Sequence, residues 1–232
     1  TFEEKANLLR QFGIDHLVTI PFTQEFSQMT SQEFIQKILV EKIHTKKLVI
    51  GYDHRFGKNR EGSFEYLKSH GQEFGFELEE ISRQDVDEIG VSSTKIRKAL
   101  ESGDIKTATN YLGRPYELNG LVVKGQQIGR SIGFPTANIH MKHSRPALTG
   151  VYAVKLGNRN GVANLGIRPT VAGIPKLLLE VHLLNFNEDI YGQHVQVTFM
   201  EKIRDEMKFE NINALIEQIK KDVIHATRFF EK

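Results

Sequence analysis

The spacing of apolar residues changes near residues 113–120, and this change constrains the fold more than any other feature of the chain. Before it, short apolar runs alternate with amphipathic segments. After it, apolar residues recur at alternate positions between turns rich in glycine, asparagine and proline. The stretch GRPYELNG (113–120) itself combines glycine and proline. We therefore predict two domains, residues 1–112 and residues 113–232.

The first domain is predicted to have an α/β fold. Strand-like apolar runs cover residues 16–22, 47–51 and 76–82. One helix is expected after Thr30, which is followed three residues later by a glutamate in the spacing of a capping box. A second helix is expected after Ser63. The order strand, helix, strand, helix, strand indicates a parallel sheet with right-handed crossovers.

The second domain is predicted to be a small antiparallel β-barrel. Its strand candidates have alternating apolar residues and are separated by turn residues. They are residues 118–125, 150–157, 160–167, 176–186 and 194–203. A helix from about Asn211 carries an apolar stripe on one side, and we expect it to plug or flank the barrel.

Composition excludes several classes of function. With 39% hydrophobic residues in 232, the chain can bury a real core, and with no cysteine it has neither disulfides nor a thiol nucleophile. No apolar stretch approaches the length of a membrane helix, and a net charge of +2 does not indicate a nucleic-acid partner. We expect a cytoplasmic protein that binds small molecules rather than membranes or nucleic acids; its oligomeric state is not predicted.

A glycine-rich turn, GYDHRFGKN (51–59), follows a predicted strand and precedes a predicted helix. It is not a Walker A loop, because five residues separate its glycines and Asn59 stands where a magnesium-binding hydroxyl would be needed. Two explanations stay open. The turn can bind a ligand at the carboxyl end of a parallel strand, with Gly51 and Asp53 in contact, or Asp53 can simply bond its own backbone.

Hydroxyls and cations gather where another helix is expected to begin, in VSSTKIRKAL (91–100). These residues are Ser92, Ser93, Thr94, Lys95 and Arg97. A helix start offers free N–H groups and the positive end of the helix dipole, so the segment can bind a phosphate. Serine and threonine are also common N-caps without any ligand, and this explanation is the more frequent one.

The segment KGQQIGRSIGFPTANI (124–139) contains the most specific pattern. Its glycines, Gly125, Gly129 and Gly133, match no dinucleotide or Walker fingerprint. Pro135 fixes the local backbone, and on an extended chain Thr136 and Asn138 project to the same side. A hydroxyl and an amide oxygen are hard ligands that suit Mg²⁺. The commoner alternative is that both side chains stabilise a turn.

Glu180 interrupts an apolar run. On a strand, Leu179 and Val181 face one way, whereas Leu178, Glu180 and His182 face the other. If that second face is exposed to solvent, Glu180 is an ordinary surface charge. If the face lines a cavity, Glu180 is a carboxylate held in place and can act as a general base.

Four segments together make the sequence similar to a known family. GRSIGFPTANI (129–139), NLGIRPT (164–170), LLEVHLLNF (178–186) and RDEMKF (204–209) resemble, in this order, the riboflavin kinase module of bacterial bifunctional riboflavin kinase/FMN adenylyltransferases. The resemblance covers essentially all of residues 113–232. In the first domain, GYDHRFG and VSSTKIR resemble motifs of the adenylyltransferase module. The implied fold is a partial Rossmann-like nucleotidyltransferase domain followed by a β-barrel with a C-terminal helix.

The resemblance also implies roles for residues. Glu180 would accept the proton of the terminal ribityl hydroxyl of riboflavin as this attacks the γ-phosphorus of ATP. Thr136 and Asn138 would hold Mg²⁺. The ATP of the kinase would contact Lys124, Gly125, Gly129, Gly133, Pro135, Thr136 and Asn138. The flavin would contact Arg204, Asp205 and Met207 on a mobile flap, with NLGIRPT closing the other side. The adenylyltransferase nucleotide would contact Gly51, Asp53, Ser92, Ser93, Thr94 and Arg97.

One departure concerns the adenylyltransferase module. Family members carry an H-x-G-H-type motif after their first strand, and none of the nine histidines here forms it. We therefore expect phosphorylation of riboflavin to FMN, an adenylyltransferase site that is incomplete in this chain, and adenylylation of FMN to FAD in the complete protein. A flavin-binding protein without turnover is the alternative, and an RNA-handling protein is a more remote one.

Overall fold

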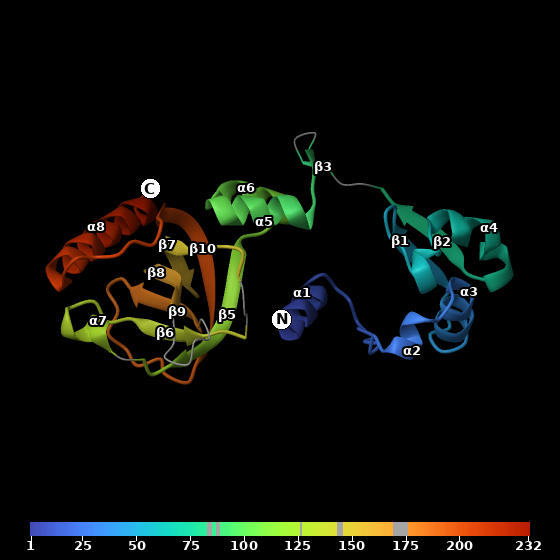
Figure 1. The fold of residues 1–232 in the computed structure, drawn as a ribbon, viewed down its shortest axis with the longest axis horizontal. Coiled ribbons are helices and arrows are strands. Elements are labelled where there is room, and N and C mark those ends of the chain that lie inside the picture. The colour runs from blue at the N-terminus through green and yellow to red at the C-terminus, as the bar shows by residue number, and fades with distance from the viewer. Residues whose placement is uncertain (83–84, 87–88, 126, 143–145, 169–175) are drawn as a thin grey trace. The chain divides into compact units, whose positions relative to one another are not determined.

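The computed structural model describes residues 1–82, 85–86, 89–125, 127–142, 146–168 and 176–232. The chain forms two compact units, one of residues 9–90 and one of residues 1–8 with residues 91–232. Figure 1 shows the elements of both units.

The sheet of the 9–90 unit is parallel, as predicted. β1 (Lys47–Gly51) pairs with β2 (Glu77–Ile81), and α4 (Phe64–Phe74) lies between them in the chain. Ser63, after which this helix was expected, is the N-cap of α4, and Gly75 ends the helix in the left-handed conformation at φ 72°. This half of the expected strand–helix alternation is therefore confirmed.

The helix expected after Thr30 is also present. It consists of α3 (Ser31–Phe34), which continues into the π-helical segment η1 (Ile35–Val40). Thr30 and Glu33 form the predicted capping box, each side chain accepting a hydrogen bond from the other residue's backbone N–H. The buried core of this unit is made by Ile35, Ile50, Leu67 and Phe76. The remaining short elements are α2 (Gln24–Ser27), η2 (Lys58–Arg60), β3 (Asp85–Val86) and β4 (Ile89–Gly90).

The strand predicted over residues 16–22 is wrong. The segment has no strand assignment, and the side chains of Leu17 and Val18 are 41% and 62% exposed. β1 and β2 form a two-stranded sheet, and no described strand makes a ladder with this segment. The apolar spacing of the segment fits a strand, but a strand also needs a neighbour to satisfy its backbone groups.

The predicted β-barrel is present and closed. Its six strands are antiparallel, in the spatial order β10-β5-β6-β9-β8-β7. The strands are β5 (Tyr116–Val123), β6 (Ala137–His140), β7 (Gly150–Leu156), β8 (Arg159–Arg168), β9 (Lys176–Leu183) and β10 (His194–Arg204). β6 was not expected as a separate strand; it contains Asn138 of the Pro-Thr-Ala-Asn sequence.

Four helices accompany the barrel: α5 (Ser93–Ser102), α6 (Ile105–Leu112), α7 (Ile128–Ser131) and α8 (Ile212–Phe230). α5 and α6 share a core with the barrel strands through Leu100 and Ile105, so they pack with residues 113–232 although we assigned them to the first domain. The start of α1 (Phe2–Gln11) belongs to the same unit, since Glu3 forms an ion pair with Lys142 at 2.7 Å. The boundary at 112/113 stays a prediction about the functional modules.

α8 flanks the barrel rather than plugging it (Figure 1). Ala226 on α8 is fully buried against Val151, Ala153 and Val162 of β7 and β8. The barrel interior is filled instead by other apolar side chains, among them Leu179 and Val181. Strand alternation therefore places Glu180 on the outer face, which α8 partly covers.

Tyr152 is buried in the barrel and donates a hydrogen bond to the Thr149 carbonyl at 2.9 Å. Burial, with a smaller effect from Asp205, raises the pKa of Tyr152 to about 12. Unfolded tyrosine titrates near 10, so the folded state holds the phenolic proton more tightly, and stability should fall as pH rises from about 10 to 12. We expect Tyr152→Phe to lack this loss of stability when the free energy of unfolding in urea is measured from about pH 10 to 12. If this free energy fell equally with pH in the variant and the wild type, the prediction would be contradicted.

Candidate active site

A cavity of about 300 Å³ lies on the outer face of the barrel. One wall is apolar and comes from α8 through Leu215, Ile219 and Val223. The barrel side contributes Glu180, so the face that carries this carboxylate lines a cavity and is not an open surface. Of the two explanations that the sequence left open for Glu180, the cavity is the one observed. Its catalytic role stays a prediction.

Strand pairing brings a row of polar side chains across this face. Asn138 of β6 is paired with Glu180 of β9, and Glu180 is paired with Asn164 of β8. The row continues through Val151 of β7 to Arg204 of β10. Paired residues on antiparallel strands project to the same face. Amide, carboxylate and guanidinium groups that lie far apart in the sequence are thereby gathered on one surface.

Thr136 immediately precedes β6, and Asn138 is the second residue of this strand. Thr136 lines the cavity. Asn138 is 8% exposed, and its side chain packs over the backbone of Gly125. A Cβ atom added to Gly125 would come within 2.4–2.6 Å of the Asn138 amide group. A side chain at position 125 would therefore displace the Asn138 side chain.

A second cavity, of about 370 Å³, adjoins the first. It is lined by Phe186 and Tyr191 and by Pro135 of the Pro-Thr-Ala-Asn sequence. Thr136 lines both cavities, so its side chain lies where they meet. The ammonium nitrogen of Lys124 lies over the ring of Tyr191, 5.8 Å from the ring centroid. The two spaces could hold two ligands that come together at Thr136.

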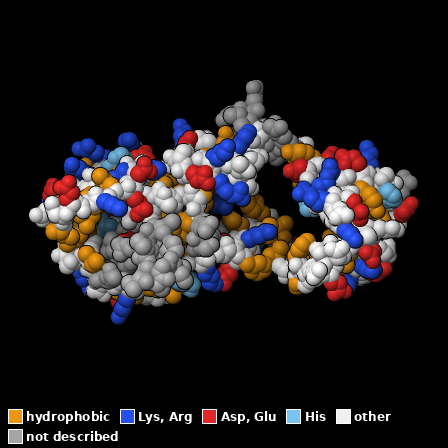
Figure 2. Space-filling view, in the orientation of Figure 1, with side chains coloured by type: hydrophobic (Ala, Val, Ile, Leu, Met, Phe, Trp, Pro, Cys, Tyr) orange, Lys and Arg blue, Asp and Glu red, His pale blue; other side chains and the backbone are white. Residues whose placement is uncertain are grey.

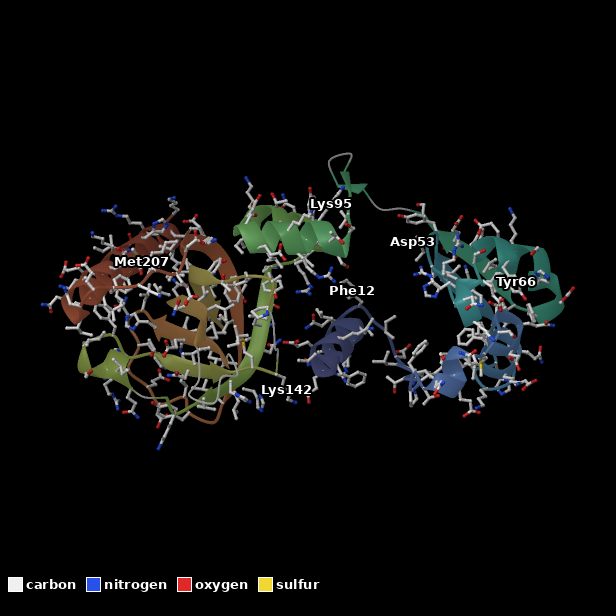
Figure 3. All side chains as sticks on the ribbon, viewed as in Figure 1. Phe12, Asp53, Tyr66, Lys95, Lys142 and Met207 are labelled. Carbon is white, nitrogen blue, oxygen red and sulfur yellow. The ribbon has the colours of Figure 1, made fainter. Side chains whose placement is uncertain are left out.

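Other predicted kinase residues are divided between the cavity and its surroundings. Gly129, Arg204 and Met207 line the first cavity, and Figure 3 labels Met207 on the segment between β10 and α8. Asp205 is not among the described residues that line it; its carboxylate pairs instead with Lys202 at 2.6 Å. Gly133 has a φ of 87°, which suits glycine in the turn before Pro135.

His182 also lines the first cavity, although the sequence pattern did not indicate a role for it. Its Nδ1 atom lies 2.8 Å from the Pro135 carbonyl oxygen and donates to it, and its ring meets Phe134 edge-on. His182 therefore ties β9 to the turn that carries Thr136. The sequence feature that could have indicated His182 is its position two residues after Glu180, on the same face of the strand.

The predicted adenylyltransferase residues fall in both compact units. Gly51 ends β1, and Asp53 lies in the turn that follows. In the other unit, Ser92 is the N-cap of α5 and accepts a hydrogen bond from the Lys95 backbone N–H at 3.3 Å. Ser93, Thr94 and Arg97 are exposed on the first turns of α5. Their part in nucleotide binding stays a prediction.

Two family models match the chain and define its class. The model described as riboflavin kinase matches residues 112–230, which contain the barrel and its cavities, and the model described as FAD synthetase matches residues 1–95. Curated relatives named bifunctional riboflavin kinase/FMN adenylyltransferase include one from Escherichia coli K12, at 41% identity over 98% of this chain and 74% of the relative. One from Haemophilus influenzae is 42% identical over 98% and 75%. The chain belongs to the bifunctional riboflavin kinase/FMN adenylyltransferase family.

A solved structure also shares the fold. A crystal structure described as a macrolide-efflux protein from Streptococcus pneumoniae aligns at a TM-score of 0.85 and 31% identity, covering 97% of this chain and 74% of that one. Its description names another activity, and a shared fold does not by itself decide function. Among the described residues, no helix has both the length and the apolar character needed to cross a bilayer.

Proposed function

We propose that the barrel unit transfers the γ-phosphoryl group of ATP to the terminal ribityl hydroxyl of riboflavin and so forms FMN. The observation that carries this proposal is the position of Thr136 between two adjoining cavities, one of which also contains Glu180. A phosphoryl transfer needs two ligands held end to end with a base at their junction. We also propose a cytoplasmic location, because ATP is made and kept inside cells.

We assign the second cavity to the nucleotide and the first to the flavin. Pro135, which the family resemblance connects with ATP, lines the second cavity. Lys124, which it also connects with ATP, lies over the ring of Tyr191, a residue that lines the same cavity. Arg204 and Met207, which it connects with the flavin, lie at the first. The first cavity also has the apolar wall of α8, which suits a flat tricyclic ring.

Mg²⁺ suits the two oxygen donors of this segment, of which Thr136 lines both cavities and Asn138 lines neither. Thr136 offers a hydroxyl and Asn138 an amide oxygen, and Mg²⁺ in nucleotide sites commonly takes few protein ligands beside water and phosphate oxygens. The described residues contain no group of three His, Asp or Glu side chains suited to a metal ion. When bound, the ion would neutralise charge on the phosphates.

Glu180 supplies the proton acceptor. As the ribityl oxygen forms its bond to the γ-phosphorus, the bond from that phosphorus to the bridging oxygen breaks, and ADP leaves with the electron pair. The hydroxyl proton passes to the Glu180 carboxylate. Apolar side chains around Glu180, among them Val162 and Ile219, limit water near the reacting groups.

The second activity of the family, transfer of an adenylyl group from ATP to FMN, is proposed for residues 1–112. The residues that the family resemblance connects with this nucleotide are Gly51, Asp53, Ser92, Ser93, Thr94 and Arg97. None of the nine histidines supplies the H-x-G-H-type motif, so we expect this chain to make little FAD.

Incubation with riboflavin, ATP and Mg²⁺, followed by chromatography of the flavins, tests the function. We expect FMN as the main product and little FAD. Efficient FAD formation would contradict the expectation for the adenylyltransferase, and absence of FMN would refute the kinase. Riboflavin binding without turnover would favour the non-catalytic flavin protein. Figure 2 shows cationic and anionic side chains interspersed on the visible face. Retention of RNA that weakens as salt is raised would favour the RNA-handling alternative.

A further inference from the structure

A buried carboxylate lies in the apolar face of α8. Asp222 is 2% exposed and lines the first cavity beside Val223 and one turn from Ile219. A carboxylate in such surroundings loses its hydration and is costly unless it is paired. The proton transfer assigned to Glu180 does not use this group. The burial of Asp222 must therefore be explained by the group with which it is paired.

Asp222 holds the guanidinium of Arg204. The Nε atom of Arg204 lies 3.0 Å from both carboxylate oxygens, and its Nη2 atom donates to Oδ2 at 2.8 Å. The Nε2 atom of Gln218, one turn earlier on α8, donates to Oδ1 at 2.9 Å. Pairing of a guanidinium edge with a carboxylate fixes orientation as well as charge.

An irregularity in β10 explains how Arg204 reaches α8. The register of β10 against β7 shifts between Lys202 and Arg204, which places Ile203 as an extra residue. Ile203 packs with the cluster that contains Ala226 of α8, and Arg204 pairs with Asp222 of the same helix. β-bulges turn side chains away from the regular alternation. Here the bulge directs two successive residues toward α8.

The pairing with Asp222 does not use all the N–H groups of the Arg204 guanidinium. Its Nη1 atom donates to the Asp205 carbonyl at 2.9 Å, while Nε and Nη2 are bound to Asp222. A guanidinium carries five N–H groups, so one N–H on each terminal nitrogen is not used by these contacts. Because Arg204 lines the cavity, those groups can meet acceptor atoms of a ligand there.

The position of Arg204 relative to Glu180 suits an elongated ligand. Three strand steps separate them around the barrel, from β9 to β8, β7 and β10. At the usual spacing between strands this is about 14 Å along the sheet. A five-carbon chain that ends in a tricyclic ring system has comparable length. With the reacting hydroxyl at Glu180, the ring would reach the Arg204 end.

We propose that Asp222 is a positioning residue for flavin recognition: it fixes the Arg204 guanidinium so that its remaining N–H groups face the carbonyl and nitrogen acceptors of the isoalloxazine ring. This inference rests on the proposed kinase function. It makes a buried ion pair between α8 and β10 part of the flavin site. It also predicts that substitution of Asp222 lowers the affinity for riboflavin and leaves the affinity for ATP nearly unchanged.

The test compares Asp222→Asn with wild type and with Glu217→Gln, an exposed substitution on the same helix. Quenching of riboflavin fluorescence gives Kd, and steady-state kinetics gives kcat and both KM values. Loss of a charged hydrogen bond predicts a rise of roughly 10- to 100-fold in Kd and KM for riboflavin. We expect kcat at saturating riboflavin and KM for ATP to stay near wild type, and Asp222→Glu to recover part of the affinity.

A double variant covers the case in which Asp222→Asn does not fold. Arg204→Met with Asp222→Leu removes both charges of the pair, a change that proteins often tolerate. We expect it to fold and to bind riboflavin as weakly as Asp222→Asn. If the folded double variant bound riboflavin with wild-type affinity, the inference would be overturned. It would also be overturned if Asp222→Asn lowered kcat and raised the KM values for riboflavin and ATP by similar factors. Failure of the wild-type protein to bind riboflavin would instead refute the proposed function.

Discussion

Replacement of Glu180 by glutamine is expected to lower kcat by about 10²–10⁴-fold, the usual contribution of a positioned general base. Glutamine keeps the size of the side chain but cannot accept the hydroxyl proton. Since its shape is retained, the affinities for riboflavin and ATP should change little. Rapid-quench measurement of FMN formation, together with Kd values for both ligands, separates the chemical step from binding.

Glu117→Gln provides the matched control. Glu117 is also a barrel-strand glutamate, but it accepts hydrogen bonds from Gln196 and Thr198 and lines neither of the two adjoining cavities. We expect near wild-type turnover for this variant. If Glu180→Gln turned over as fast as Glu117→Gln, Glu180 would have no part in the mechanism.

The position of Glu180 shows what the sequence could and could not predict. Alternation along 176–186 put Glu180 and His182 on one face and Val181 on the other, as observed. The sequence could not decide which face lines a cavity. That depends on closure of the barrel, which puts Val181 inside, and on α8, which covers part of the outside.

The Arg204–Asp222 pair required information that local patterns do not contain. Asp222 stands in the apolar stripe of the last predicted helix, between Ile219 and Val223, which was a visible irregularity. Its partner lies 18 residues earlier and reaches it through a bulge. A bulge changes which face a strand residue occupies, and residue alternation cannot foresee it.

Long-range pairing also explains the failure at residues 16–22. Apolar spacing is a property of the segment alone, whereas strand formation depends on hydrogen bonds to another segment. The helix starts at Thr30 and Ser63 do not depend on distant segments, because the partners of a helix cap lie within one helical turn. Local chemistry was therefore predicted more reliably than pairing.

Thr136→Val is expected to lower kcat by on the order of 10²–10³-fold, because it removes an oxygen that we assign to stabilising the charge of the transferred phosphoryl group. Valine keeps the shape of threonine, so the riboflavin Kd should stay near wild type. A titration of activity against Mg²⁺ should show a higher requirement for the ion. Thr198→Val is the control, since Thr198 is a strand threonine bonded to Glu117 and outside both cavities.

Gly125→Ala tests the same assignment through Asn138 without replacing either proposed magnesium ligand. The new methyl group would come within 2.4–2.6 Å of the Asn138 amide, so that side chain has to move. If Asn138 is a magnesium ligand, the variant should show the raised Mg²⁺ requirement of Thr136→Val in milder form, with riboflavin affinity retained. An unchanged Mg²⁺ requirement in both variants would mean that Thr136 and Asn138 only shape the turn, which is the alternative that the sequence left open.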